Sequence, residues 1–186
     1  MSQPNGSQPS ATVAVVPHDP AWASAFRAAA EPIAAALAPE LVAIHHAGST
    51  SIPGIKAKPT IDILIEARQI DAIDAHDGAM SELGYAPRGE LGIAGRRYFT
   101  KTSDMARTHN VHVFQTGHPE IERMLNLRDY LRAHPDAAEA YSRLKEQLAR
   151  QFPGDIESYT LGKSEFIEAI VVKARAWREE RTYSSL

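Results

Sequence analysis

Short apolar runs along the chain predict the strands of a sheet. The most apolar run is 60–67, where Ile61, Ile63, Leu64 and Ile65 surround one acid, Asp62. Such a continuous run is typical of a strand that is buried on both faces. Further strands are predicted at 41–46, 96–101 and 108–114, with a brief strand at 85–87 and an extended segment or strand at 13–16.

Helical spacing of apolar positions predicts helices on either side of these strands. The first, 21–37, follows Asp19 and Pro20, which suit the N-cap and the first helical position. Pro32 inside it predicts a kink or a break. A second helix is predicted at 70–83 and ends at Gly84. After Pro119 the pattern is helical throughout, with predicted helices at 120–133, 136–151 and 155–180.

This order of elements predicts an α+β fold, with a mixed sheet flanked by helices and a helical C-terminal section. The length of 186 residues favours one domain. We expect this domain to span 13–180, between an N-terminal tail at 1–12 and a C-terminal tail at 181–186. The polar N-terminal tail is expected to be disordered.

Composition narrows the classes of function. The chain has no cysteine, which excludes disulfides, thiolate catalysis and cysteine-bound zinc. Its net charge of −3 and the lack of a basic tract argue against nucleic-acid binding. Residues 1–10 carry no charged side chain and no apolar stretch, so no signal peptide is predicted. No run approaches the roughly 18 apolar residues of a membrane span. We therefore expect a cytoplasmic protein; the sequence is silent on oligomeric state.

The candidate chemistry lies between the strands at 41–46 and 60–67. Gly48 and Ser49 form a turn, and Thr50 and Ser51 follow. Such a turn can bring backbone N–H groups and hydroxyls close to a phosphate. Asp62 on the next strand can hold a divalent cation for that phosphate. The alternatives are an ordinary turn and an acid that pairs with a lysine or arginine.

The segments 17–22, 46–55, 58–63, 96–99, 107–114, 128–135 and 159–163 together resemble the GrpB family. The resemblance covers about 15–174 and implies the nucleotidyltransferase fold of the DNA polymerase β type. It implies that Gly48 and Ser49 hold the phosphates of a nucleotide. Members of the family occur alone and fused behind a dephospho-coenzyme A kinase domain, which implies a link to nucleotide or cofactor metabolism.

This chain has an incomplete set of the acidic residues that active nucleotidyltransferases use. A second acid is expected two residues after Asp62, where Leu64 stands. Glu66 is the next residue on the same strand face, about 7 Å beyond Leu64. The later strand that normally supplies a third acid offers Asn110 and His112. His112 with Asp62 is a candidate site for one ion such as Zn²⁺ or Mn²⁺. Alternatively, His112 binds a substrate phosphate or belongs to a buried polar network.

Cations near the strand ends and on the C-terminal helices complete the predicted site. Of these we predict that Lys58, Arg97 and Lys163 bind phosphate, against the alternative of solvated surface side chains. Arg128 and the adjacent Asp129 are expected to pin the C-terminal helices to the sheet.

We thus predict a nucleotidyltransferase-like protein that binds a nucleotide or a phosphorylated small molecule. The predicted cleft lies between the Gly48-Ser49 loop and the strand of Asp62. Mg²⁺ or Mn²⁺ would be held by Asp62, Glu66 and His112, with Asp62 and His112 as the catalytic residues. The alternatives are a catalytically degenerate nucleotide-binding module and a metabolite enzyme that reuses the same pocket with Asp62 and His112 as acid and base.

Overall fold

A computed structural model describes residues 13–183. The predicted tail at 1–12 and residues 184–186 of the predicted C-terminal tail lie outside the described residues. The sheet has five strands in the order β1-β2-β5-β4-β3, with β2 and β5 parallel and all other neighbours antiparallel. The strands are β1 (Leu41–Ala47), β2 (Ile61–Ala67), β3 (Ala86–Pro87), β4 (Arg96–Ser103) and β5 (Ala106–Gln115).

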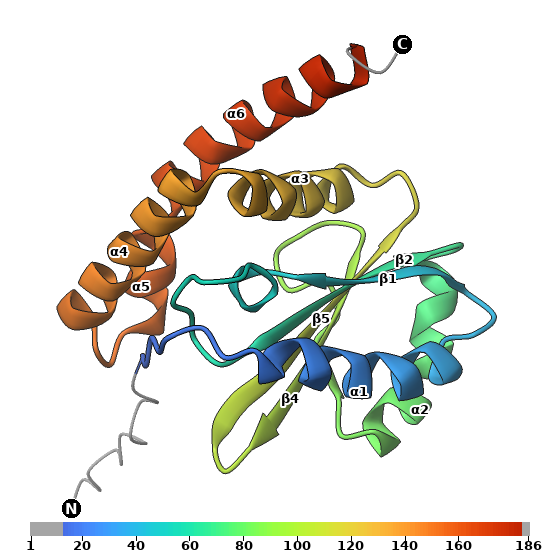
Figure 1. Ribbon diagram of the computed structural model, residues 1–186. Coiled ribbons are helices and arrows are strands. Elements are labelled where there is room, and N and C mark those ends of the chain that lie inside the picture. The colour runs from blue at the N-terminus through green and yellow to red at the C-terminus, as the bar shows by residue number, and fades with distance from the viewer. Residues whose placement is uncertain (1–12, 184–186) are drawn as a thin grey trace, which may run out of the picture.

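Helices cover both faces of this sheet (Figure 1). On one face lie α1 (Ala21–Ala36), the 3₁₀ helix η2 (Asp71–His76) and α2 (Asp77–Glu82), which pack on the odd-numbered side chains of β2, such as Ile63 and Ile65. On the other face lies α3 (Pro119–Ala133), where Leu64 packs on Phe114 and Ile121. Because side chains alternate along a strand, Asp62 and Glu66 share the α3 face with Leu64.

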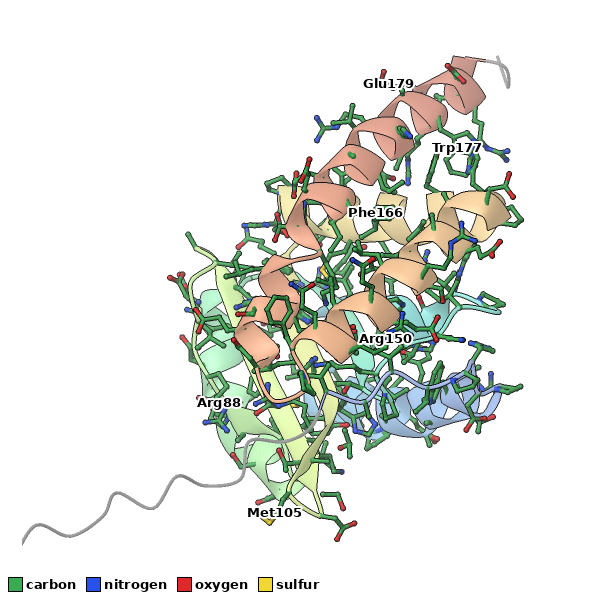
Figure 2. All side chains as sticks on the ribbon, turned by 90° about the vertical axis from the view of Figure 1, so that its left-hand side faces the viewer. Arg88, Met105, Arg150, Phe166, Trp177 and Glu179 are labelled. Carbon is green, nitrogen blue, oxygen red and sulfur yellow. The ribbon has the colours of Figure 1, made fainter. Side chains whose placement is uncertain are left out.

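The C-terminal section contains α3, α4 (Pro135–Gln151), α5 (Ile156–Leu161) and α6 (Ser164–Tyr183). Figure 2 shows α4 and α6, with Arg150 and Phe166, side by side on one flank of the molecule, and Met105 at the opposite end in the β4–β5 turn. Ile52 and Ile55 of the β1–β2 connection are buried in a cluster with apolar residues of α3, α4 and α6. This connection is thus part of the interface between the sheet and the C-terminal helices. None of the helices within 13–183 is long and apolar enough to cross a membrane.

The predicted α+β class is confirmed, and several element boundaries differ. The helix α1 continues through Pro32, which removes one N–H donor without ending the helix. The predicted helix 70–83 begins as the 3₁₀ helix η2. The single helix predicted at 155–180 is divided into α5 and α6 by Gly162 and Lys163. A Cβ at Gly162 would lie 2.5 Å from Cδ2 of Leu148, so this position packs directly on α4.

Candidate functional site

Gly48 packs directly against the carboxylate of Asp62. The end of β1 places Ala47 opposite Asp62, and Gly48 follows with φ 65° and ψ −173°. This backbone region is essentially restricted to glycine. A Cβ at Gly48 would lie 2.1 Å from Oδ2 of Asp62, so no larger residue fits without a shift. The predicted turn and the predicted acid therefore do meet.

The hydroxyl groups of Thr50 and Ser51 are engaged by neighbouring groups of the protein. Ser49, Thr50 and Ser51 form the 3₁₀ helix η1. The hydroxyl of Ser51 donates to the carbonyl of Gly48 at 2.6 Å, and that of Thr50 lies 3.0 Å from Nε2 of His46. Burial and the charge of Arg132 lower the pKa of His46 to about 4, so this ring is neutral at physiological pH. The predicted Thr50 and Ser51 thus shape the turn through their side chains.

Asn110 of β5 holds Asp62 in place by a hydrogen bond, and His112 of the same strand lies close by. The parallel register sets Asp62 opposite Asn110, whose Nδ2 donates to Oδ1 of Asp62 at 2.8 Å. Asn110 in turn accepts from the hydroxyl of Tyr98 at 2.7 Å. Nε2 of His112 lies 3.8 Å from the same Asp62 oxygen. Burial raises the pKa of Asp62, but His112, Asn110 and the charge of Lys163 outweigh it, so the pKa lies below its usual value. Asp62 is therefore a carboxylate at neutral pH.

The orientation of His112 follows from Arg96. Nη1 of Arg96 lies 3.4 Å from Nδ1 of His112, and a guanidinium can only donate. Nδ1 is therefore the acceptor, and Nε2 carries the proton that faces Asp62. The other nitrogens of the buried Arg96 donate to the carbonyls of Glu90 and Leu91 at 3.0 and 2.7 Å. Nδ1 of His112 is thus engaged by Arg96, and Nε2 faces Asp62 at 3.8 Å.

These residues do not fit a resident metal centre. Glu66 lies about 13 Å along β2 from Asp62, and its Oε1 is 2.9 Å from Nε2 of His45. Of the residues within 13–183, no group of three or more histidines, cysteines or acids could hold a metal ion. One oxygen of Asp62 accepts from Asn110, and His112 directs a proton at that same oxygen. The structure brings Asp62 and His112 together and does not bring Glu66 to them.

Three lysines gather around two buried tyrosines beside Asp62. Nζ of Lys163, at the junction of α5 and α6, lies 4.5 Å from the ring centre of Tyr159, and Nζ of Lys58 lies 5.6 Å from the same ring. Lys145 of α4 is only 2% exposed, and its Nζ lies 4.4 Å from the ring centre of Tyr141. The side chains of Tyr141 and Ser49 are hydrogen-bonded, which connects this group to the turn.

The charges of these lysines act on one another and on Asp62. Burial and the charge of Lys163 lower the pKa of Lys145 to about 7. Burial and the charge of Lys58 lower the pKa of Lys163 to about 8, although Asp62 raises it. Burial also lowers the pKa of Lys58, an effect that Asp62 opposes and Arg107 reinforces. We call Lys58, Arg107, Lys145 and Lys163 the cation group.

Arg97, a predicted phosphate ligand, lies on the other face of the sheet. Its guanidinium pairs with Asp71 and Asp74 of η2, on the face covered by α1 and α2. Alternation along β4 instead directs its neighbour Arg96 toward His112. The structure therefore separates the predicted Arg97 from Asp62, and it buries Lys145, a position that no local sequence pattern reveals as buried.

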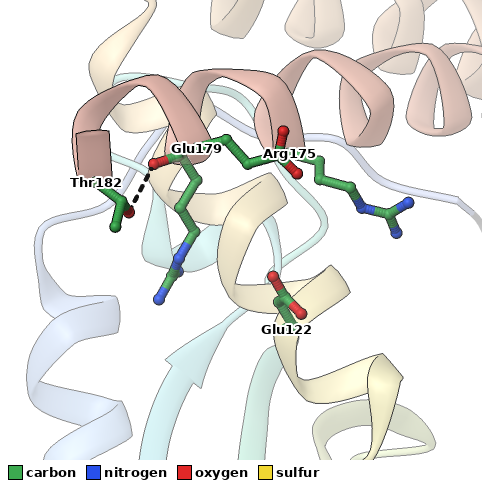
Figure 3. Close-up of a pocket in the computed structure, with 5 residues that line it drawn as sticks. Glu122, Arg175, Glu179 and Thr182 are labelled. Atoms are coloured by element: carbon green, nitrogen blue, oxygen red, sulfur yellow. Dashed lines mark hydrogen bonds between the residues drawn. The ribbon is translucent and has the colours of Figure 1, made fainter. Parts of the chain in front are cut away.

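A separate pocket of about 370 Å³ lies between α3 and α6 (Figure 3). It is lined by Glu122, Arg175, Arg178, Glu179 and Thr182. The hydroxyl of Thr182 donates to the backbone carbonyl of Arg178 at 3.0 Å. Two acids and two arginines balance one another here, so this pocket lacks the excess of positive charge found around Asp62.

Sequence comparison finds relatives over most of the chain. The family model described as GrpB protein matches residues 12–173. The UPF0157 protein YqkA of Bacillus subtilis is 47% identical over 173 residues, which are 93% of this chain and 50% of that protein. This chain thus spans half the length of that relative. The glutamate-rich protein GrpB of Alkalihalophilus pseudofirmus is 31% identical over 163 residues, 86% of this chain and 94% of that protein.

Structural comparison agrees with this assignment. The crystal structure of GrpB from Enterococcus faecalis matches with a TM-score of 0.83 and 36% identity, over 88% of this chain and 99% of that one. The Cid1 poly(U) polymerase, solved with Mg and 3′-dATP bound, matches with a TM-score of 0.53 and 14% identity, over 80% of this chain and 49% of that one. The second likeness concerns the fold alone, which is nucleotidyltransferase-like. With its family match, relatives and shared architecture, this chain belongs to the GrpB family.

Proposed function

We propose that this protein binds a nucleotide or another phosphorylated small molecule beside Asp62, with the cation group neutralising the phosphate charge. The observation that carries the proposal is an excess of unpaired positive charge. No carboxylate within 13–183 lies within 4.0 Å of a charged nitrogen of Lys58, Arg107, Lys145 or Lys163. Asp62 acts on Lys58 and Lys163 only through longer-range electrostatics.

Burial makes this charge excess costly without a ligand. Lys145 is 2% exposed, and its Nζ donates to the backbone carbonyl of Lys56 instead of a carboxylate. A buried ammonium without a counter-ion favours its neutral form, which is why the pKa of Lys145 falls to about 7. A phosphate close to Lys163 and Lys58 would supply the missing negative charge and restore the charged form of these lysines. The net charge of the whole chain is −3, so the positive charge is local to this group.

The acids favour binding over nucleotidyl transfer. Transfer requires positioned metal ions to offset the charge that develops on the phosphate. Leu64 occupies the second acid position, and Asn110 of β5 lies beside Asp62 as an amide. We therefore propose a metal-independent binding protein, which is the degenerate module that the sequence left as an alternative. The likeness to Cid1 supports a nucleotide as one ligand to test, through fold analogy alone.

Isothermal titration calorimetry with ATP, pyrophosphate and inorganic phosphate tests the proposal. Each titration is made in EDTA and again in Mg²⁺. We expect at least one of these anions to bind in EDTA, and Lys163→Met to weaken that binding about tenfold or more. Lys173→Met is the matched control, because Lys173 is an exposed lysine of α6. Binding that occurs only in Mg²⁺, or equal losses in both variants, would refute the proposal.

A further inference from the structure

Two arginines of α3 hold the two ends of the Gly48 turn. Nη1 of Arg128 donates to the backbone carbonyl of His46, directly before the turn, at 3.0 Å. Nε and Nη2 of Arg132 both donate to the backbone carbonyl of Ser51, at the end of the turn, at 3.0 and 2.6 Å. Residues four apart on a helix lie on the same face, so one face of α3 reaches both ends.

These contacts are charge-assisted and do not involve the backbone of Gly48, Ser49 or Thr50. A hydrogen bond from a charged donor is stronger than one between neutral groups. The carbonyl groups that accept lie outside the tripeptide Gly48 to Thr50, whereas Asp62 packs against Gly48 itself. Asp129 contacts both arginines, with Oδ1 at 2.7 Å from Nε of Arg128 and 3.9 Å from Nη1 of Arg132. This shared acid orients the two guanidinium groups toward the backbone.

The α4 helix holds the same β1–β2 connection further along. The hydroxyl of Ser142 accepts from the backbone N–H of Lys56 at 2.6 Å, and Nζ of Lys145 donates to the carbonyl of Lys56. The side chain of Lys56 pairs with Glu146 at 2.6 Å. Helices α3 and α4 therefore hold the end of β1 and the connection at three residues: His46, Ser51 and Lys56. Lys145, a member of the cation group, makes one of the contacts to Lys56.

We propose that Arg128 and Arg132 are positioning residues that fix the Gly48 turn in its binding conformation before a ligand arrives. The inference rests on the proposed function and extends it to residues that do not touch the ligand. A turn with Gly48 in a sparsely populated backbone region pays an entropic cost if it must be ordered during binding. Two charged donors on a rigid helix remove that cost beforehand, because the carbonyls on both sides of the turn are held in the free protein.

The test combines ligand affinity with local amide exchange in the full chain. Arg132→Met and the milder Arg132→Lys are compared with Arg123→Met. Arg123 also lies on α3, and it pairs with Glu120 and Glu168 instead of the turn. Pyrophosphate in EDTA is the probe. We expect Arg132→Met to weaken its binding about tenfold and to speed hydrogen exchange of the peptide spanning 47–53 without ligand. Exchange in β5 should be unchanged, and Arg123→Met should change neither quantity.

Two results separate the two proposals. Unchanged exchange at 47–53 in both Arg132 variants would overturn the positioning role, as would equal acceleration in the turn and in β5. Arg132→Lys, which keeps the charge and loses the paired donors, provides this measurement if Arg132→Met does not fold. Failure of the unaltered protein to bind pyrophosphate, ATP and phosphate would overturn the proposed function, and with it the role of the arginines in binding. Lys163→Met should weaken binding with no change in exchange.

Discussion

Substituting Gly48 by alanine tests the close packing between the turn and β2. Two costs follow from the structure. The backbone of Gly48, at φ 65° and ψ −173°, is a strained region for any residue with a Cβ and costs about 1–3 kcal/mol. The new methyl group would meet Oδ2, Cγ and Cβ of Asp62 at 2.1, 2.8 and 2.9 Å, and such overpacking costs about 1–3 kcal/mol more. We therefore expect a loss of about 2–6 kcal/mol in the free energy of unfolding.

Gly54→Ala is the matched control for this substitution. Gly54 also has a positive φ, 81°, but a Cβ there would have no heavy atom within 4 Å. It carries only the backbone cost, about 1–2 kcal/mol. Adding Asp62→Ala to Gly48→Ala removes the two closest contacts of the new methyl group, so the double variant should be less unstable than the sum of the single variants, by about 0.5–3 kcal/mol.

Urea unfolding followed by tryptophan fluorescence compares these four variants with the unaltered protein, since Trp22 is a buried residue of α1 and Trp177 lies in α6. Equal losses for Gly48→Ala and Gly54→Ala would refute the close contact. Additive effects of Gly48→Ala and Asp62→Ala would show that the methyl group and the carboxylate do not meet. Either result would remove the argument that the turn and the acid form one unit.

Four further predictions concern the charged side chains. The folded-state pKa of Lys145, about 7, lies below its ordinary value of 10.5, so the unfolded chain binds more protons between these values. The contribution of Lys145 to stability therefore rises with pH, by about 1–2 kcal/mol from pH 7 to 9, and Lys145→Met should remove this rise in urea titrations. Anion affinity should fall over the same pH range, because the protonated lysine is the form that binds phosphate. Calorimetry in buffers of different ionisation enthalpy would detect the proton uptake that accompanies binding. Absence of this uptake would contradict the role of Lys145 in binding. Arg96→Gln should change the tautomer of His112, visible in its ¹⁵N ring shifts; an unchanged Nε2–H tautomer would show that Arg96 does not set it. Arg97→Gln should leave pyrophosphate binding within about twofold of the unaltered protein, since its guanidinium lies on the opposite sheet face, and a larger loss would contradict that placement.

The sequence alone predicts most of the helices and strands, and it predicts that the turn at Gly48 lies next to Asp62. Both follow from local signals: a turn at the end of one apolar run and an acid inside the next. Which of Arg96 and Arg97 shares the sheet face of Asp62 is not a local property. It depends on which face of β4 is covered by α3, and a one-residue change in the alternation exchanges the two faces.

Burial of charge was equally hidden in the sequence. The sequence around Lys145 predicts a solvated helical position, yet the side chain is 2% exposed and contacts the backbone of the β1–β2 connection and the ring of Tyr141. Gly162, which separates α5 from α6, shows the same limit, because its close contact with Leu148 joins positions that no single helical pattern relates. Tertiary contacts decide such positions, and propensity does not.

The contacts of the β1–β2 connection also set the order in which the site can form. Arg132 lies 81 positions beyond Ser51, and Glu146 lies 90 positions beyond Lys56. Closing a loop between residues so distant in sequence costs more conformational entropy than closing a short loop, and contacts of this kind slow folding. During synthesis, the Gly48 turn emerges long before the helices that hold it. A nascent or truncated chain that ends before α3 would contain both Gly48 and Asp62 and still lack an ordered turn between them.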